Sequence, residues 1–262
     1  MKRLQSRDNP RFKRIAHLAA SARARRAEGL IVLDGVHLVE AYLAAFGPNG
    51  IQLIVRDDAG EQPEIRSLRA RVGDDAALSM ANRLFDSLSP VETPAGIMAV
   101  VPLPAIAAPS GTHGLSVLLD GIQDPGNLGA ILRSAVAAGS DQVYLSSACA
   151  DPWSPRCLRG GMGAQFRLAM HDRQLLPQVA HAYPGQIIAA SATGEMALFD
   201  APIKERCAIV IGAEGQGISP ELLACATLRV RIPMAHGIES LNAASAATLL
   251  FYEWRRRHRS AC

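Results

Sequence analysis

Long apolar runs and paired cysteines are both missing from this sequence of 262 residues. No uninterrupted apolar stretch approaches the ~20 residues that a membrane-spanning helix needs, so we expect no contact with a membrane. The basic start, Met1 to Arg7, is not followed by an apolar segment of the kind found in secretion signals. The five cysteines are an odd number, widely spaced, with no CxxC pair. They favour incidental or buried thiols in a reducing cytosol, and we therefore expect a cytoplasmic protein.

Metal-ligand spacing is also lacking. None of the seven histidines stands at ligand spacing from a cysteine or a carboxylate, so we expect no metal. Hydrophobic residues make up 49% of the chain and charged residues only 19%. This composition provides a sizeable core and argues against global disorder, and the length suits one large domain or two smaller ones.

The net charge of +3 is distributed unevenly along the chain. The first 29 residues carry nine Lys and Arg against two acidic residues, a local charge of +7, and four more arginines lie near the C-terminus. Clustered cations suit a phosphate backbone, because neutralising phosphates releases condensed counterions. A solvated helix face rich in arginine gives the same pattern, so charge alone leaves both interpretations open. The candidate RNA-binding residues in this region are Arg7, Arg11, Lys13 and Arg14.

The hydrophobic pattern predicts two α/β domains joined by a linker. Residues 1–101 read as a small α/β domain, with helices at 10–27 and 36–46 and strands at 30–34, 51–55 and 97–101. Residues 102–114 are rich in Pro, Ala, Gly and Ser and carry no charge, which is typical of a linker. Residues 115–262 contain five apolar runs without polar alternation, as buried parallel strands do. They begin at 115, 142, 186, 207 and 228, with helices predicted at 127–138, 173–182 and 241–258. The expected fold is a mostly parallel sheet with helices on both faces.

Three segments of the second domain each follow a predicted strand, where ligands collect in open α/β sheets. The first segment runs from Asp120 to Ala135. Asn127 is a candidate N-cap of the helix that follows the turn Asp124-Pro125-Gly126. Arg133 lies off the apolar stripe of that helix, on a face of small residues where it can meet a phosphate.

The second segment, Val210 to Pro220, places three glycines around Glu214, a loop where backbone can approach a ligand closely. Its spacing is G-x-x-G-x-G and Pro220 starts a new element after it, which disfavours a nicotinamide-binding fingerprint. In the third segment, Ile232 to Ala247, a strand ends at Pro233 and Ser240-Leu241-Asn242 opens the final helix. Ser240 and Asn242 suit helix caps as well as a site. The Ala and Ser residues that follow would allow another helix to pack closely, as in a dimer.

Together the three segments resemble motifs 1, 2 and 3 of the SpoU/TrmH family of RNA 2′-O-ribose methyltransferases. The resemblance covers residues 115–255 well and is weaker over 1–101, which is similar to the substrate-binding domain of many members. It implies a SPOUT fold with a C-terminal trefoil knot, which general rules of chain topology would not predict. It also implies a homodimer, an RNA substrate and S-adenosylmethionine as the methyl donor, with ribosomal RNA preferred over transfer RNA.

The resemblance also assigns candidate residues. Those matching the donor-binding positions are Thr193, Gly194, Gly212, Glu214, Gly215, Ile232, Met234, Leu241 and Asn242. Those matching the catalytic and RNA-binding positions are Asn127, Arg133, Glu214, Ser240 and Asn242. Because a guanidinium is a poor base, we expect Arg133 to pair with a phosphate and polarise the 2′-hydroxyl. Asn127 would orient Arg133 or the ribose, and Ser240 and Asn242 would align the loop.

Two positions depart from the family pattern. Gly161 stands where members often have Ser, and Ala169 stands where a Pro is common. Two other functions remain open: a SPOUT methyltransferase that acts on a base nitrogen, and a non-catalytic RNA-binding module that retains the fold. The pattern of Asn127, Arg133 and Ser240-Leu241-Asn242 argues against the first alternative, and intact Arg133, Glu214 and Asn242 argue against the second.

Overall fold

The computed structural model describes residues 2–107, 114–238 and 240–258. Contacts divide the chain into two compact units, the first made of Met1–Pro104 with Asp151–Phe166 and the second of Ala105–Ala150 with Arg167–Cys262. The units differ from the predicted domains in one place, because residues 151–166 pack with the N-terminal unit. Residues 108–113 of the predicted linker at 102–114 lie outside the described residues, and so does Cys262. The other four cysteines are free thiols.

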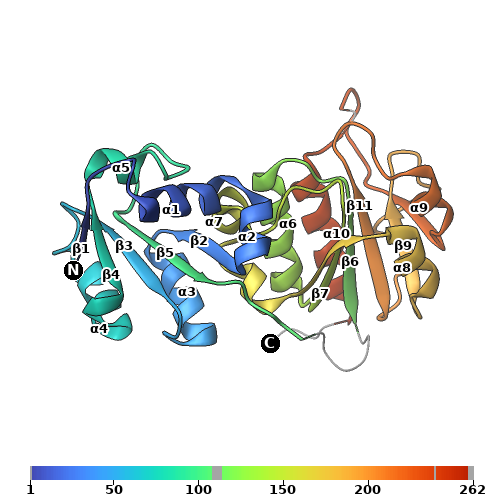
Figure 1. The fold of residues 1–262 in the computed structure, drawn as a ribbon. Coiled ribbons are helices and arrows are strands. Elements are labelled where there is room, and N and C mark those ends of the chain that lie inside the picture. The colour runs from blue at the N-terminus through green and yellow to red at the C-terminus, as the bar shows by residue number, and fades with distance from the viewer. Residues whose placement is uncertain (1, 108–113, 239, 259–262) are drawn as a thin grey trace. The chain divides into compact units, whose positions relative to one another are not determined.

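The first unit contains a five-stranded mixed sheet in the order β1-β4-β3-β5-β2 (Figure 1). Its strands are β1 (Lys2–Leu4), β2 (Leu30–Asp34), β3 (Gln52–Arg56), β4 (Ala77–Met80) and β5 (Ile97–Pro102). β1, β4 and β3 are parallel, whereas β5 runs antiparallel to both β3 and β2. The predicted strands near 30–34, 51–55 and 97–101 are therefore confirmed, and β1 and β4 are additional.

Helices cover both faces of this sheet and complete two apolar clusters. They are α1 (Pro10–Ala20), α2 (Ala22–Glu28), α3 (Val36–Phe46), α4 (Pro63–Val72), α5 (Asn82–Asp86) and α7 (Pro155–Gly161). The prediction of one helix over 10–27 is wrong, because the backbone is extended at Ser21, with φ −115° and ψ 114°. The Ser21 hydroxyl accepts a hydrogen bond from the Ala24 N–H and so starts α2 as a new helix.

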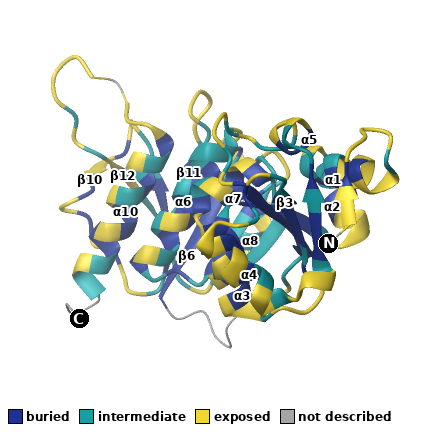
Figure 2. Ribbon diagram, turned by 90° about the vertical axis from the view of Figure 1, so that its left-hand side faces the viewer, coloured by how far each residue is buried: buried dark blue, intermediate teal, exposed yellow. Residues whose placement is uncertain are grey.

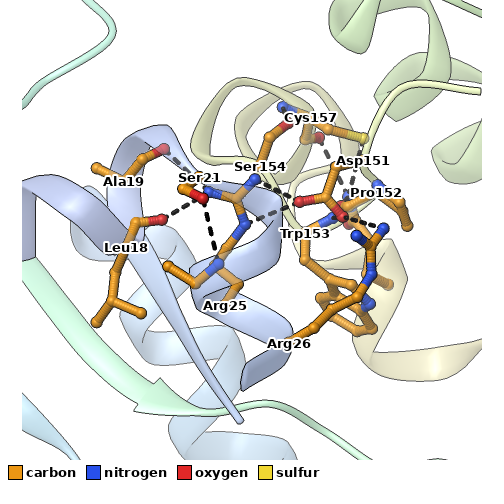
Figure 3. Close-up of polar contacts among 12 residues, drawn as sticks. Leu18, Ala19, Ser21, Arg25, Arg26, Asp151, Pro152, Trp153, Ser154 and Cys157 are labelled. Carbon is orange, nitrogen blue, oxygen red and sulfur yellow. Dashed lines mark hydrogen bonds and ion pairs between the residues drawn. The ribbon is translucent and has the colours of Figure 1, made fainter. Parts of the chain in front are cut away.

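A buried ion pair ties the segment that contains α7 to the first two helices (Figure 3). Arg25 is only 3% exposed. Its guanidinium donates to the backbone oxygens of Leu18 and Ala19, at 2.6 and 3.0 Å. Its Nε donates to the Asp151 carboxylate at 2.8 Å, and Nη2 donates to the same oxygen. Residues far apart in sequence are thereby held in one unit.

The second unit contains an all-parallel, seven-stranded sheet in the order β10-β12-β9-β11-β6-β7-β8. Its strands are β6 (Leu115–Asp120), β7 (Gln142–Ser146), β8 (Ala169–Gln174), β9 (Gln186–Ala190), β10 (Met196–Ala197), β11 (Cys207–Gly212) and β12 (Leu228–Arg231). The five predicted strands are confirmed. The predicted helix at 173–182 begins late, because residues 169–174 form β8, and the helix is α8 (Leu176–Ala182).

Helices lie on both faces of this sheet, as predicted (Figure 1). α6 (Pro125–Ala138) and α10 (Ala243–His258) pack together on one face, where hydroxyls of Ser134 and Thr248 are 2.7 Å apart. α8 and α9 (Pro220–Ala224) cover the other face, with an apolar cluster that includes Leu118 and Val210 of the sheet. Among the described residues, no helix is long and apolar enough to cross a membrane.

Candidate functional site

The loops that carry the three sequence motifs meet at the carboxyl edge of the parallel sheet in the second unit. β6 and β11 are neighbours, and the Asp120 position is paired with Gly212 where both strands end. β9 and β12 are neighbours as well, so the loops that follow them also share this edge. In the sheet, β6 lies between β7, which follows it in sequence, and β11, which comes much later. In open α/β folds, ligands bind at the carboxyl ends of the strands where the strand order reverses in this way.

The helix that carries the first motif is capped by Asp124. The Asp124 carboxylate accepts from the N–H of Asn127 at 2.8 Å, and Pro125 occupies the first turn. The prediction of Asn127 as the N-cap is therefore wrong. The helix begins earlier because proline suits the first helical position, where an N–H has no partner. As a result, the Asn127 side chain is not used in capping.

The glycine-rich loop of the second motif closes on itself. Ala213 and Gly217 exchange backbone hydrogen bonds of 3.0 and 2.8 Å. A side chain at position 212 would place its Cβ 2.2 Å from the carbonyl carbon of Gly217, so the closure requires glycine there. The loop is then anchored to the neighbouring strand, because Asp120 accepts from both the N–H and the hydroxyl of Ser219, at 2.9 and 2.7 Å. No role for Asp120 is predicted from the sequence, although its place at the end of a strand could have indicated one.

Three predicted site residues from the three motifs are hydrogen-bonded in a chain. The Asn127 amide donates to the carboxylate of Glu214, and the Asn242 amide donates to the side-chain oxygen of Asn127 at 3.1 Å. The Asn242 oxygen accepts from the N–H of Ala244 at 2.9 Å, so Asn242 also caps α10. Glu214 and Asn242 are exposed and Asn127 is half-buried, so an approaching hydroxyl group can reach the group of three. It presents a carboxylate and two amides, which can orient a hydroxyl and accept or share its proton.

An apolar hollow of about 570 Å³ lies at the carboxyl ends of β9 and β12, beside the hydrogen-bonded residues Asn127, Glu214 and Asn242. Its size is within the range of pockets for small molecules. Of the predicted donor-binding residues, Ile232, Met234 and Leu241 line it, together with Ser240. Ile238 and Leu241 are exposed apolar residues at this hollow, 55% and 39% accessible, and so offer apolar surface to a ligand.

The other predicted donor-binding residues do not line this hollow. Thr193 and Gly194 are in the loop after β9, which Arg231 holds by donating to the carbonyl oxygens of Gly194 and Glu195, both at 2.9 Å. A Cβ at Gly194 would lie 2.3 Å from the backbone of Val230, so the loop can approach β12 only with glycine. Glu214 and Gly215 instead line a second hollow of about 410 Å³ at the ends of β6 and β11.

Arg133 is not part of the Asn127–Glu214–Asn242 chain. It is exposed on α6 and, among the described residues, no hydrogen bond or ion pair is found for it. It lies six positions after Asn127, which corresponds to roughly 9 Å along the helix and to a different face. Among the described residues no hydrogen bond joins Asn127 to Arg133, and the role of Asn127 in orienting Arg133 or the ribose stays a prediction.

The predicted RNA-binding residues of the first unit divide into two pairs. Lys13 forms an ion pair with Asp8 at 3.1 Å, and Arg14 forms one with Glu28 at 2.6 Å. Arg7 and Arg11 are exposed, and no acidic partner is found for either in the described part of the chain. Exposed cations without a partner remain available to a phosphate backbone.

Both departures from the family pattern have a structural counterpart. A side chain at Gly161 would place its Cβ 2.3 Å from Oε1 of Gln165. Gln165 is fully buried and donates to the carbonyl oxygen of Cys157 at 3.1 Å, so glycine at 161 makes room for it. At the other position, the N–H of Ala169 donates to the carbonyl oxygen of Asp141 at 2.9 Å, a bond that proline cannot make.

Comparison with known proteins identifies the family. The sequence profile described as SpoU rRNA Methylase family matches residues 114–252, which is more than half of the chain. The chain belongs to the SpoU family. The members are RNA 2′-O-ribose methyltransferases that use S-adenosylmethionine, and the trefoil knot at the C-terminal end follows for this chain from its resemblance to them.

Relatives of this SpoU protein match it over nearly its whole length. The 23S rRNA (guanosine(2553)-2′-O)-methyltransferase RlmP of Bacillus subtilis is 28% identical over 257 residues, which cover 97% of this chain and 100% of the relative. A crystal structure of an RNA 2′-O ribose methyltransferase is 29% identical with a TM-score of 0.82, covering 97% and 98% of the two chains. The methyltransferase AviRb of Streptomyces viridochromogenes, in complex with AdoMet, is 28% identical with a TM-score of 0.84, covering 95% and 98%.

The residues of the apolar hollow fit S-adenosylmethionine. Its volume of about 570 Å³ accommodates an adenosyl group with a methionine chain, and Ile232, Met234 and Leu241 give it apolar walls. Ser191 and Ser240 supply polar groups in the same hollow. The close approach of Gly194 to β12 leaves backbone at the rim, where it can bind a polar ligand without side chains in the way.

Proposed function

We propose that this SpoU protein methylates a ribose 2′-hydroxyl of ribosomal RNA, as a homodimer. The observation that carries the proposal is the hydrogen-bonded chain of Glu214, Asn127 and Asn242, which joins the three motif loops beside a hollow that fits the methyl donor. Relatives over the full length are named for ribosomal RNA, which favours this substrate over transfer RNA. A cytoplasmic location stays a prediction.

Each side chain has a part in the proposed reaction. When bound, S-adenosylmethionine supplies a methyl group on a sulfonium, which is already a strong electrophile. The chain therefore has to align the 2′-hydroxyl and help to remove its proton. Glu214 and Asn127 hold the hydroxyl through their oxygen and amide groups, and Ser240 and Asn242 fix the loop between hollow and hydroxyl. Arg133 pairs with the phosphate next to the target ribose and polarises the 2′-hydroxyl.

In the proposed homodimer, each subunit supplies Arg133 to the site of the other subunit. Arg133 is exposed on α6 away from the Asn127–Glu214–Asn242 chain, and Leu249 and Tyr252 are exposed on α10, 39% and 47% accessible (Figure 2). The small residues expected at a dimer contact are partly used within the chain, because Ala247 is fully buried. We propose that two copies pair through the exposed surfaces of α6 and α10, so that Arg133 of one copy serves the site of the other.

A complementation assay tests the shared site. Arg133→Ala and Asn127→Ala are each expected to have at most about a tenth of wild-type activity alone. After co-expression or remixing in equal amounts, about half of the dimers contain one of each variant, and one of their two sites is intact, so activity should return to about a quarter of wild type. No recovery, with mixed dimers demonstrated by differential tagging, would contradict an Arg133 that acts across the dimer.

The substrate is tested by methyl transfer from labelled S-adenosylmethionine to unmodified total RNA, with ribosomal and transfer RNA separated afterwards. The proposal predicts label in ribosomal RNA and little in transfer RNA. Arg133→Ala serves as the matched control, with donor affinity unchanged. Label in transfer RNA alone would overturn the substrate. Donor binding without label in either fraction would favour a non-catalytic module.

A further inference from the structure

A second carboxyl edge of parallel strands occurs in the first unit, and it forms a hollow of its own. β1, β4 and β3 run parallel, and the residues that follow each of them line an open hollow of about 760 Å³. The lining residues are Arg3, Gln5, Ser6, Arg7, Asp8, Asp57, Ala81, Asn82, Arg83 and Leu84. The same topology places ligand sites in open α/β folds, and the volume accommodates one nucleotide.

The charges at this hollow suit an anionic ligand. Asp57 is neutralised by Arg3, whose Nε donates to it at 2.9 Å, and this partner lowers the pKa of the Asp57 carboxyl, so it stays ionised and paired. Asp8 is paired with Lys13. Two cations of the lining are left, Arg7 and Arg83, for which the described residues provide no acidic partner. Arginine is suited to phosphate through its fork of donors.

The wall of the hollow also contains an unsatisfied acceptor. Asn82 donates from Nδ2 to the Asp58 carboxylate at 2.9 Å, which fixes the orientation of its amide. Its Oδ1 is buried and, within the described residues, has no hydrogen-bond partner. A buried polar group without a partner calls for a donor from outside the chain. The exocyclic amino group of a nucleobase is such a donor.

Among the described residues, no aromatic side chain lines this hollow. A base that enters it can therefore stack only on the guanidinium of an arginine. Arg3 is held on Asp57 by two of its nitrogens, so its guanidinium plane is fixed at the edge of the hollow. Bases that are splayed out of single-stranded RNA stack on guanidinium planes as well as on aromatic rings. A base within a duplex is inaccessible to this kind of contact.

We propose that this hollow binds one unstacked nucleotide of single-stranded RNA. Arg7 and Arg83 bind the phosphates on either side, Arg3 stacks on the base, and Asn82 accepts from its amino group. This inference rests on the proposed function in that the ligand is RNA. It assigns a binding site in the first unit that is separate from the loops proposed for methyl transfer in the second.

The test measures binding of a fluorescein-labelled, single-stranded oligoribonucleotide of about ten nucleotides, within the site sizes of single-strand binders. A duplex of the same length and sequence is the comparison, and the full-length chain is used without the methyl donor. We expect the single strand to bind more tightly than the duplex. Arg83→Ala should weaken single-strand binding by roughly 5- to 10-fold and reduce the salt dependence by the equivalent of one phosphate contact.

Arg71→Ala is the matched control. It removes the same charge from the same unit, but Arg71 is exposed near the end of α4, which returns the chain to the amino edge of the sheet before β4. Binding should change by less than about twofold, because long-range charge effects are screened by salt. Equal losses for Arg71→Ala and Arg83→Ala, or equal affinity for single strand and duplex, would overturn the proposal.

A photocrosslink provides a second readout. With 4-thiouridine in the oligoribonucleotide, peptides that contain residues 3–8 or 81–84 should carry the crosslink, and crosslinks confined to other peptides would contradict the site. Neither measurement depends on methyl transfer. Binding at this hollow by a protein that transfers no methyl group would overturn the proposed function and leave this inference standing, whereas methyl transfer without binding here would do the reverse.

Discussion

The amide nitrogen of Asn242 lies 3.1 Å from the side-chain oxygen of Asn127, and the two residues are separated by 115 positions in the sequence. Asn127 in turn donates to Glu214, so one asparagine joins the first motif loop to the other two. A side-chain amide has both donors and an acceptor, which is what a residue in the middle of such a chain requires. Aspartate has no donor at neutral pH and could not hold Glu214.

We therefore predict that Asn127 and Asn242 act as one unit in catalysis. Asn127→Ala and Asn242→Ala should each lower kcat by roughly 10- to 100-fold, and the double variant should lose little more than the worse of the two. Single-turnover rates with saturating RNA measure this, and thermal unfolding checks that both variants fold. Losses that multiply in the double variant would show two independent roles and contradict the linked chain.

Two glycines of the second motif, Gly212 and Gly215, are predicted to differ in how strongly their substitution weakens donor affinity. Gly212→Ala places a methyl group against the backbone of Gly217 and should open the Ala213–Gly217 closure, weakening donor affinity by roughly 10-fold or more. Gly215→Ala, in the same loop, is the comparison: no atom of the described residues lies within 4 Å of its Cβ, so it should weaken donor affinity less than Gly212→Ala does. Calorimetric titration with S-adenosylmethionine measures both variants, and equal affinity for Gly212→Ala and wild type would contradict the account of the loop.

The buried ion pair of the first unit gives a prediction on stability. Arg25→Met leaves Arg26, at 3.9 Å, as the remaining cation near Asp151 among the described residues, and should lower the free energy of unfolding by about 3–5 kcal/mol. Arg25→Met combined with Asp151→Leu should be less destabilised than Arg25→Met alone, because no unpaired charge remains. Urea unfolding measures the series, with exposed Arg23→Met as the control, expected within about 0.5 kcal/mol of wild type.

The pH dependence of stability should contain a contribution from Asp34. Burial raises the pKa of its carboxyl above the ordinary 3.8, and the Ser89 hydroxyl and Arg159 offset this only in part. A raised folded-state pKa means that the folded protein keeps a proton that the unfolded chain releases. Stability from this group therefore falls as pH rises from the unfolded-state pKa through the folded-state pKa.

Asp34→Asn removes that titration while it keeps an acceptor for Ser89. The free energy of unfolding of Asp34→Asn minus that of wild type should rise with pH across this window and then level off. Urea unfolding at a series of pH values measures the difference. Asp75→Asn, at an exposed position, is the control. A flat or falling line for Asp34→Asn would contradict a buried Asp34 carboxyl with a raised pKa.

The sequence predicts much of this fold because its signals are local. Buried parallel strands read as apolar runs, and the strands from Leu115 to Arg231 lie close to where those runs occur. The apolar pattern does not reveal β8, because four of its six residues, AMHDRQ, are polar and the strand lies at the edge of the sheet. The cap of α6 is also missed, because Asp124 and Asn127 are both favourable caps and only Pro125 at the first turn separates them.

Other features depend on contacts that no local pattern contains. Arg25 and Asp151 are 126 positions apart, and neither has a neighbour in sequence that predicts the pair. The assignment of residues 151–166 to the first unit follows from such contacts. Gly161 is a similar case. This glycine departs from the family pattern, and only the buried side chain of Gln165, which it accommodates, explains it. The three motif loops, by contrast, are brought to one edge by parallel strands and could be predicted.

The most direct test of the central claim is the chemical identity of the methylated product. Ribosomal RNA labelled from S-adenosylmethionine by the wild-type chain is hydrolysed in alkali, which cleaves every linkage next to a free 2′-hydroxyl. We expect the label in an alkali-resistant dinucleotide, and we expect Asn127→Ala and Arg133→Ala to lower its rate of formation at least about tenfold. Label that appears instead in a mononucleotide, on the base, would contradict the assignment of Asn127, Glu214 and Asn242 to a ribose hydroxyl.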